Sequence, residues 1–371
     1  MPDMPDPESS SESKGPSIPL TTTQAKKHAL LDLVERAGCP KESVRKVSVE
    51  LVHKFKWIAK AIGLFLDMTR IIIAYSERED EPGSPRERQY YDQIVQLHPE
   101  MPEMPRLFKY ASTQAEVAVT LANIIEFHMT ESKNNDTNTL RYTIISYLPL
   151  NPKHDVVQPP ISGDSKADRG FNHPATAAAL TPLKYRSKFQ RDQQAFMDMV
   201  NAGEVLITHK LWPSVMYPNN VQYDRNCISE ELFQSHVIVR AMRAIFHGKS
   251  SAFDGKRSGS KASQAEMHGM ERPTPASVAY VALHVVFALS NIENWARADD
   301  SSFDYYKFYV RVKEMFQDPE DDWTTETLDF LASEMPVLRA KKGGKRKRRD
   351  EDELLNSEED NESDDELRRE M

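Results

Sequence analysis

The stretch 149–185 holds the residues of this chain whose types come nearest to acid–base chemistry. His173 follows Asp164 and Asp168 in this Pro-, Gly- and Asp-containing segment, which shows no sustained helical or strand periodicity. An imidazole beside a carboxylate can act as a general acid or base, yet no nucleophile stands at a recognisable spacing from them. Ordered loops of this length are uncommon and often functional. An enzyme of unidentified reaction, with its site in this loop, is therefore one hypothesis for the function.

The same loop also fits a structural role, which we favour over catalysis. Phe171, Asn172 and His173 follow one another directly. We predict that Phe171 anchors the loop to the body of the protein, while Asn172 and His173 satisfy backbone groups. The short polar side chains of such a segment commonly bond to nearby main chain rather than to a ligand.

A second group of ionisable side chains falls on one face of a helix predicted over 230–247. Its members recur at helical spacing and are His236, Arg240, Arg243 and His247. The opposite face carries the apolar residues Val237, Ile238, Ala241, Met242 and Ile245. Such a basic strip could bind phosphates or an acidic partner. The alternative is the ordinary solvated face of an amphipathic helix.

The C-terminal tail carries the most specific signal in the chain. Its basic run matches a nuclear-import signal, with the members Lys341, Lys342, Lys345, Arg346, Lys347, Arg348 and Arg349. Twelve acids follow this run, so the alternative is a nonspecific polyanion-binding or self-neutralising tail. We predict a nuclear protein, or one shared between nucleus and cytoplasm, with an import receptor among its partners.

Two serines in the acidic part of the tail are candidate phosphorylation sites. Ser357 and Ser363 are each followed by acidic residues, the pattern that acidophilic kinases prefer. Phosphorylation would add negative charge and strengthen the competition of the acidic block for the basic run.

The net charge of −9 conceals this sorting of charge in the tail. Residues 339–349 carry eight bases and no acid, and residues 350–371 carry twelve acids and two arginines. The remaining residues, 1–338, have a net charge of −7. Nucleic-acid-binding modules usually present a basic face, so the acidic body argues against that function.

The cysteine content and the N-terminus limit the class of protein. Cys39 and Cys227, the two cysteines, lie far apart in sequence. They argue against a disulfide scaffold or a cysteine-rich zinc site, and they fit a reducing compartment. The N-terminus is acidic and has no apolar core of a signal peptide. We predict no metal site, no cofactor and no membrane association.

Hydrophobic periodicity predicts an all-α protein, an irregular multi-helix bundle with long loops and disordered termini. Helices are expected over 22–38, 42–75, 112–130, 137–148, 191–202, 230–247, 275–290, 303–316 and 324–333. The stretch from Thr274 to Phe316 should be central, because its first helix is apolar on nearly every side. The expected divisions are a disordered acidic N-terminus (1–20), a helical hairpin or coiled-coil-like segment (21–80), a helical core domain (85–335) and a disordered basic-then-acidic tail (336–371).

An ordered series of short motifs resembles an uncharacterised domain family abundant in mushroom-forming fungi. The motifs are Arg169-Gly170-Phe171-Asn172-His173, Pro182 with Tyr185, Trp212-Pro213, Tyr217, Ile245-Phe246, Ser250-Ser251-Ala252, His268-Gly269-Met270, Thr274-Pro275, Phe287-Ala288-Leu289-Ser290 and Phe303-Asp304-Tyr305. The resemblance covers roughly residues 85–320. Thr181 stands where the family is expected to have the cysteine of a Cys-Pro pair. The resemblance implies a lineage and no activity.

The sequence does not identify the function, and three hypotheses follow from it. The leading one is a nuclear, non-enzymatic helical protein that binds a protein partner. The second is a nucleic-acid-binding protein that uses the basic helix face and the basic tail. The third is the enzyme with its site in the 149–185 loop.

Overall fold

The computed structural model describes residues 21–74, 85–256, 261–293 and 303–338. Within these residues the chain forms fourteen α-helices and no β-strand, which confirms the predicted all-α class. The helices are α1 (Thr22–Arg36), α2 (Lys41–Ala61), α3 (Met68–Ile73), α4 (Pro85–Gln96), α5 (Glu103–Ser112), α6 (Ala115–Tyr147), α7 (Pro174–Leu180), α8 (Arg186–Arg191), α9 (Gln193–Asn201), α10 (His236–His247), α11 (Gln264–His268), α12 (Pro275–Leu289), α13 (Tyr305–Glu314) and α14 (Asp322–Ser333). Four short 3₁₀ helices join them: η1 (Gly170–Asn172), η2 (Leu183–Tyr185), η3 (Ser214–Met216) and η4 (Lys249–Ser251).

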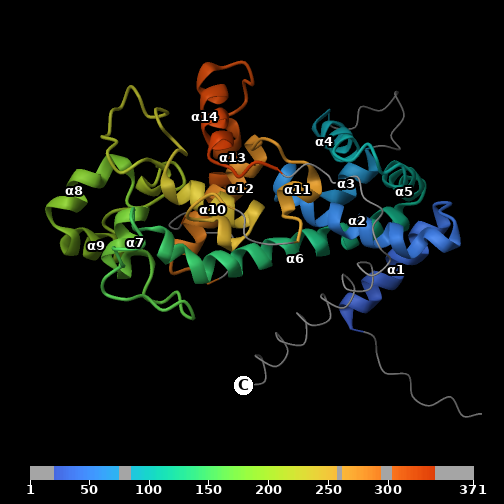
Figure 1. Ribbon diagram of the computed structural model, residues 1–371, viewed down its shortest axis with the longest axis horizontal. Helices are drawn as coiled ribbons and strands as arrows, with labels where there is room; N and C mark the ends of the chain where they lie inside the picture. Colours follow the sequence, from blue (N-terminus) through green and yellow to red (C-terminus); the bar gives the residue numbers. More distant parts are fainter. Residues whose placement is uncertain (1–20, 75–84, 257–260, 294–302, 339–371) are drawn as a thin grey trace, which may run out of the picture. The chain divides into compact units, whose positions relative to one another are not determined.

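The core is built around α6, against which α2, α10 and α12 pack. Figure 1 shows α6 as one continuous green helix. On α12, every residue from Ala276 to Leu289 is buried, which confirms the enclosed helix expected from its apolar surface. Thr274 caps this helix and Pro275 occupies its first turn, where proline's missing N–H costs no hydrogen bond.

Helix α6 corrects the prediction of two shorter helices over 112–130 and 137–148. The polar run between them suggested a break, yet the helix continues through it. Ser132 and Asp136 in this run are buried against neighbouring helices. Tertiary contacts therefore override the weak local preference of the polar residues for helix.

The long helix predicted over 42–75 is also corrected, because it is divided in two. Helix α2 ends at Ala61, and α3 begins after Asp67, whose side chain accepts a hydrogen bond from the Arg70 N–H. An added Cβ at Gly63 would lie 2.8 Å from a methyl carbon of Leu66, so the Leu66 side chain packs directly over this bend. Phe65 therefore lies in the turn between these two helices.

The helix predicted over 230–247 begins six residues later, at His236. Ser235 caps it by accepting the Ile238 N–H at 3.1 Å. Just before the cap, Phe233 has a φ of +68°, a backbone conformation incompatible with continued right-handed helix. Its ring instead packs against Trp212, 5.6 Å away between ring centroids.

Helices α1–α3 belong to the same compact unit as the rest of the chain up to Pro336. Helix α2 packs against both α6 and α12. The predicted disordered segments, 1–20 and nearly all of 336–371, lie outside the described residues. So do the nuclear-import run and both candidate phosphorylation sites.

Candidate functional site

The basic face of α10 is turned toward the C-terminal end of α6. The Arg240 guanidinium donates to the carbonyls of Tyr147, at 2.7 Å, and Leu150, at 2.8 Å, and also to that of Pro149. Nε2 of His236 lies 3.0 Å from the Leu148 carbonyl. The last carbonyls of a helix have no partner within it and carry partial negative charge. Arg240 and His236 thus satisfy the end of α6.

The other two residues of that face are also used within the chain. Arg243 donates from Nη2 to the Glu334 carboxylate at 2.7 Å and from Nε to the Glu334 carbonyl at 2.6 Å. His247 is buried, as is Arg240, while His236 and Arg243 are half-buried. The exposed basic strip expected from helical spacing is therefore corrected. Spacing identified the face, but the neighbours of that face come from distant segments.

The three residues predicted to anchor the 149–185 loop lie around η1 and the start of α7. Phe171 packs near Phe196, with 6.4 Å between ring centroids, and Asn172 donates to the Ala167 carbonyl at 2.8 Å. His173 is 5% exposed. Its Nδ1 accepts the Ala175 N–H at 3.0 Å, so Nε2 carries the proton and donates to the Pro159 carbonyl at 2.9 Å. Both ring nitrogens are engaged with backbone, which leaves neither for proton transfer to a substrate.

A cationic cluster just before this loop anchor was not singled out by the sequence. Arg169 is completely buried and donates to the carbonyls of Ala288 at 2.8 Å and Arg141 at 2.7 Å. Lys166 donates to the Ile292 carbonyl, and its Nζ lies 3.6 Å from the centre of the Phe287 ring. These two cations hold the loop against the C-terminal end of α12. The loop also holds Lys153 and Lys184, so residue type alone did not distinguish Lys166 and Arg169.

Lys166 has the most strongly shifted lysine pKa in this part of the chain. Its pKa is lowered to about 7, chiefly by burial; Glu293 opposes this shift, and the charges of Arg169 and Arg141 add to it. An amine with such a pKa is partly neutral at neutral pH and could be a nucleophile. The side chain is 2% exposed, however, and its amine donates to a backbone carbonyl. The Lys166 amine is therefore not accessible to a substrate in this conformation.

A buried polar network joins α2, α6 and α12. Asp136 pairs with Lys60, at 2.8 Å from Nζ, and accepts the Tyr280 hydroxyl at 2.7 Å. Nδ1 of His284 lies 2.8 Å from the Tyr280 carbonyl. Burial, then Asp136, raises the pKa of Tyr280 far above its usual value, and burial lowers that of His284 to about 4. His284 is thus a hydrogen-bonded histidine of the core.

A second group of ionisable residues lies where α11 meets α2. His268 stacks on Trp57, with ring centroids 4.4 Å apart, and lies 5.4 Å from the ring of His98. Nζ of Lys54 lies 3.0 Å from Nδ1 of His98 and 3.1 Å from Glu100. Burial, followed by Lys54, lowers the pKa of His98 to about 4. Burial, followed by His98 and Lys54, lowers that of His268 to about 2.

The surroundings of His98 and His268 favour the neutral form of both imidazoles. Nε2 of His98 and both ring nitrogens of His268 are buried without a hydrogen-bond partner among the described residues. In those same residues, no group of three or more His, Cys, Asp or Glu side chains could hold a metal ion. The neighbouring charge of Lys54 would also repel a cation.

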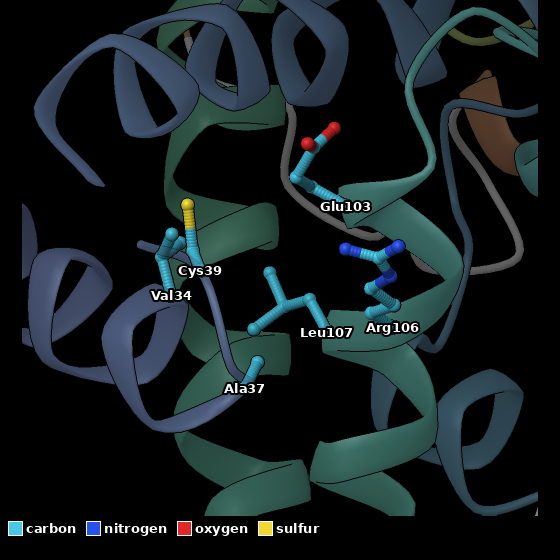
Figure 2. Close-up of a pocket in the computed structure, with 6 residues that line it drawn as sticks. All are labelled: Val34, Ala37, Cys39, Glu103, Arg106 and Leu107. Carbon is cyan, nitrogen blue, oxygen red and sulfur yellow. The ribbon is translucent and has the colours of Figure 1, made fainter. Parts of the chain in front are cut away.

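A small pocket lies between the end of α1 and α5, around Cys39 (Figure 2). Its enclosed volume is about 10 Å³, room for about one water molecule and far less than a ligand pocket provides. Glu103 and Arg106 line the pocket from α5, and Val34 and Ala37 line it from the opposite side. Burial, then Glu103 and Glu42, raises the pKa of the Cys39 thiol, which disfavours the reactive thiolate.

One accessible group of aromatic and cationic residues is a surface patch formed by the 62–67 turn, α4 and α13. We name it the aromatic–cation patch, and its members are Phe65, Arg86, Tyr90, Tyr306 and Lys313. Phe65 is 41% exposed and Tyr306 49% exposed, although their ring centroids lie only 5.3 Å apart. Large aromatic side chains gathered in this way on a surface are typical of interaction sites.

Two cations surround the ring of Tyr90 at the other end of the patch. Arg86 donates to its hydroxyl at 3.3 Å and lies 5.7 Å from its centre. The Lys313 ammonium lies 5.4 Å from the same centre and donates to the Ile62 carbonyl at 3.2 Å. The sequence did not reveal this patch, because its residues come from a turn and two helices that lie far apart along the chain.

Comparison with known proteins gives a family without an assigned activity. Neither a curated protein nor a solved structure matches the chain. No described helix has both the length and the apolar content needed to cross a membrane. Residues 128–335, more than half of the chain, match a family of unknown function, DUF6698. The match starts at His128, within α6, and ends just after α14, so it leaves out Phe65, Arg86 and Tyr90. The chain belongs to this family, DUF6698.

Proposed function

We propose that this chain is a non-enzymatic nuclear protein that acts by binding a protein partner through the aromatic–cation patch. The observation that carries the proposal is the exposure of Phe65 and Tyr306 side by side, next to the cations Arg86 and Lys313. Tyr, Phe and Arg are the residues most enriched where protein interfaces gain their binding energy. Exposed patches that combine large aromatic side chains with polar ones commonly mark interaction sites.

The placement of the other ionisable residues supports binding over catalysis. The imidazole of His173, the amine of Lys166 and the guanidinium of Arg169 all bond to backbone carbonyls. A general base or nucleophile must reach its substrate within hydrogen-bonding distance. Groups occupied by main chain in this way serve the fold.

The binding role is tested by comparing what two double variants recover from nuclear extract. Arg86→Gln with Tyr306→Ala removes one cation and one aromatic ring from the patch. Lys153→Gln with Tyr223→Ala makes the same change in charge and ring content at other surface positions. We expect proteins recovered by the unaltered chain to be lost with the patch variant and kept with the control. Equal recovery by both variants would exclude the patch as the docking surface.

Nuclear location is the second part of the proposal, and it rests on the basic run Lys341–Arg349. Clustered Lys and Arg in a chain segment rich in glycine and charge are typical of import signals. Deletion of this run from a fluorescent fusion should move the protein to the cytoplasm. An unchanged nuclear signal would refute the assignment.

Nucleic acid is the alternative partner, supported by the same basic run. A salt titration of DNA and RNA binding separates it from protein binding, using the full chain and a 1–338 truncation. A steep loss of affinity with salt that persists in the truncation would indicate a phosphate-binding surface on the helical body. Binding by the full chain alone would indicate a nonspecific polycation.

The origin of the family is a further part of the proposal. The ordered motifs from Arg169 to Tyr305 lie inside the matched region and resemble a family abundant in mushroom-forming fungi. We propose that this is the same family.

A further inference from the structure

We infer that the aromatic–cation patch receives a short acidic segment of its protein partner, an inference that rests on the proposed function. The partner segment would place carboxylates beside Arg86 and Lys313 and an apolar side chain against Phe65 and Tyr306. This assigns a chemical class to the partner, which neither the family nor the sequence motifs provide.

The cations of the patch lack carboxylate partners of their own. Among the described residues neither Arg86 nor Lys313 forms an ion pair; their polar contacts are with Tyr90 and the Ile62 carbonyl. Neighbouring cations differ, since Lys307 pairs with Asp304 at 3.2 Å and Arg70 with Asp67 at 3.4 Å. Within the described residues, the patch thus presents two positive charges that form no ion pair, and residues 1–338 together have a net charge of −7. Charge complementarity favours an acidic ligand there.

The two cations are also held in place before any ligand arrives. The half-buried Lys313 donates to the Ile62 carbonyl at 3.2 Å, and the exposed Arg86 donates to the Tyr90 hydroxyl at 3.3 Å. A guanidinium has five N–H donors, of which this contact uses one, so a fork remains for a carboxylate. Ordering these side chains in advance lowers the entropy cost of binding.

The aromatic half of the patch rests on a buried support. Phe65 packs against Tyr309, with ring centroids 5.4 Å apart. Tyr309 is buried, and its hydroxyl accepts the Leu64 N–H at 3.2 Å. The turn that carries Phe65 is therefore packed against α13. Figure 1 labels both α13 and α4. Rigid aromatic anchors of this kind suit an apolar side chain of a ligand.

The amount of charge distinguishes an acidic peptide from a nucleic acid. A nucleic-acid chain carries a phosphate at every nucleotide, and proteins that bind it neutralise several of them. The patch offers two unpaired cations, and residues 1–338 have a net charge of −7. That balance fits a few carboxylates better than a run of phosphates.

The patch joins the matched family region to the helices that precede it. Tyr306 and Lys313 lie within residues 128–335, whereas Phe65, Arg86 and Tyr90 lie before them. The ligand would therefore be specific to chains in which these N-terminal helices accompany the family domain.

The test is selection of a random twelve-residue phage-displayed peptide library on the full chain. The same library is selected on the Arg86→Gln, Tyr306→Ala variant and on the Lys153→Gln, Tyr223→Ala control. We expect the unaltered chain and the control to enrich acidic peptides that contain an aromatic or large aliphatic residue. The patch variant should bind the enriched peptides at least about tenfold more weakly.

The other outcomes distinguish this inference from the proposed function. Peptides that depend on the patch but are not acidic would overturn the acidic partner and leave the docking surface standing. No enrichment that depends on the patch would overturn both. Binding of a labelled twelve-nucleotide oligo(U) that is lost in the patch variant, without acidic peptides, would replace the peptide by single-stranded nucleic acid.

Discussion

Nζ of Lys60 on α2 lies 2.8 Å from Oδ2 of Asp136 on α6, and the same oxygen accepts the hydroxyl of Tyr280 on α12. Both members of the ion pair are buried, at 4% and 9% exposure. One carboxylate thus connects the N-terminal helices to the two helices at the centre of the fold. Asp136 belongs to the matched family region and Lys60 does not.

Removing Asp136 should therefore destabilise the protein strongly. Asp136→Ala leaves the Lys60 ammonium buried without its counter-charge, which costs about 3–5 kcal/mol. The exposed pair Lys41–Glu35, at 3.2 Å, provides the matched control. Glu35→Ala should cost about 0.5 kcal/mol or less. Urea denaturation of both variants gives the comparison, and similar losses would show that the buried pair does not hold these helices together.

Arg240 gives a second prediction, because it satisfies carbonyls that α6 cannot. Arg240→Met keeps much of the side-chain length but leaves the carbonyls of Tyr147, Pro149 and Leu150 without this donor. We expect a loss of about 2–3 kcal/mol, and faster amide exchange in the last turn of α6. Arg240→Lys should rescue little, because an ammonium cannot reproduce the planar fork. Full rescue by lysine would mean that charge alone matters at this position.

Stability should also depend on pH through the buried histidines. The folded-state pKa values of His98 and His284 are about 4, below the usual 6.5, and that of His268 is about 2. Between pH 6.5 and 4 the unfolded chain therefore binds more protons at these positions than the folded chain. The contribution of these histidines to the free energy of unfolding is fully present above pH 6.5. It falls as pH decreases, by about 1.4 kcal/mol per pH unit for each histidine.

The variant His98→Gln isolates one of these contributions. Its side-chain oxygen can still accept from Lys54, but it does not titrate. Urea denaturation between pH 6.5 and 5, where most carboxylates remain charged, should give a shallower slope than the unaltered chain. The same slope in both proteins would show that His98 is not held neutral by the fold.

Charge in the tail leads to a prediction on import. Ser357→Asp with Ser363→Asp adds negative charge to the block that follows the basic run. If the acidic block competes for that run, the nuclear fraction of a fluorescent fusion should decrease relative to the double alanine variant. Identical nuclear fractions would remove phosphorylation of these serines as a control of import.

The sequence predicted the fold class because helical periodicity is a local property. It located the enclosed helix α12 and the start of that helix, where Thr274 and Pro275 give strong local signals. The sequence also predicted a break within α6. No local pattern indicates that Asp136 pairs with Lys60, which lies 76 residues earlier in the chain. Local preference is readable from sequence, whereas compensation by a distant charge is not.

The surface could be predicted less well than the core. Phe65 falls within the single helix predicted over 42–75, but α2 ends at Ala61 and Phe65 is 41% exposed. Arg240 has the spacing of a solvated face and is 8% exposed. Periodicity shows which residues share a face of a helix. What covers that face depends on packing between segments far apart in sequence.

The most direct measurement of the central claim is photo-cross-linking from the patch in intact cells. The photoreactive residue p-benzoylphenylalanine is placed at position 306, or at position 223 as an exposed control. Binding through the aromatic–cation patch predicts a discrete cross-linked species from position 306, absent from position 223 and abolished by Arg86→Gln. Equal cross-linking from both positions, or a species from position 306 that persists with Arg86→Gln, would contradict the account.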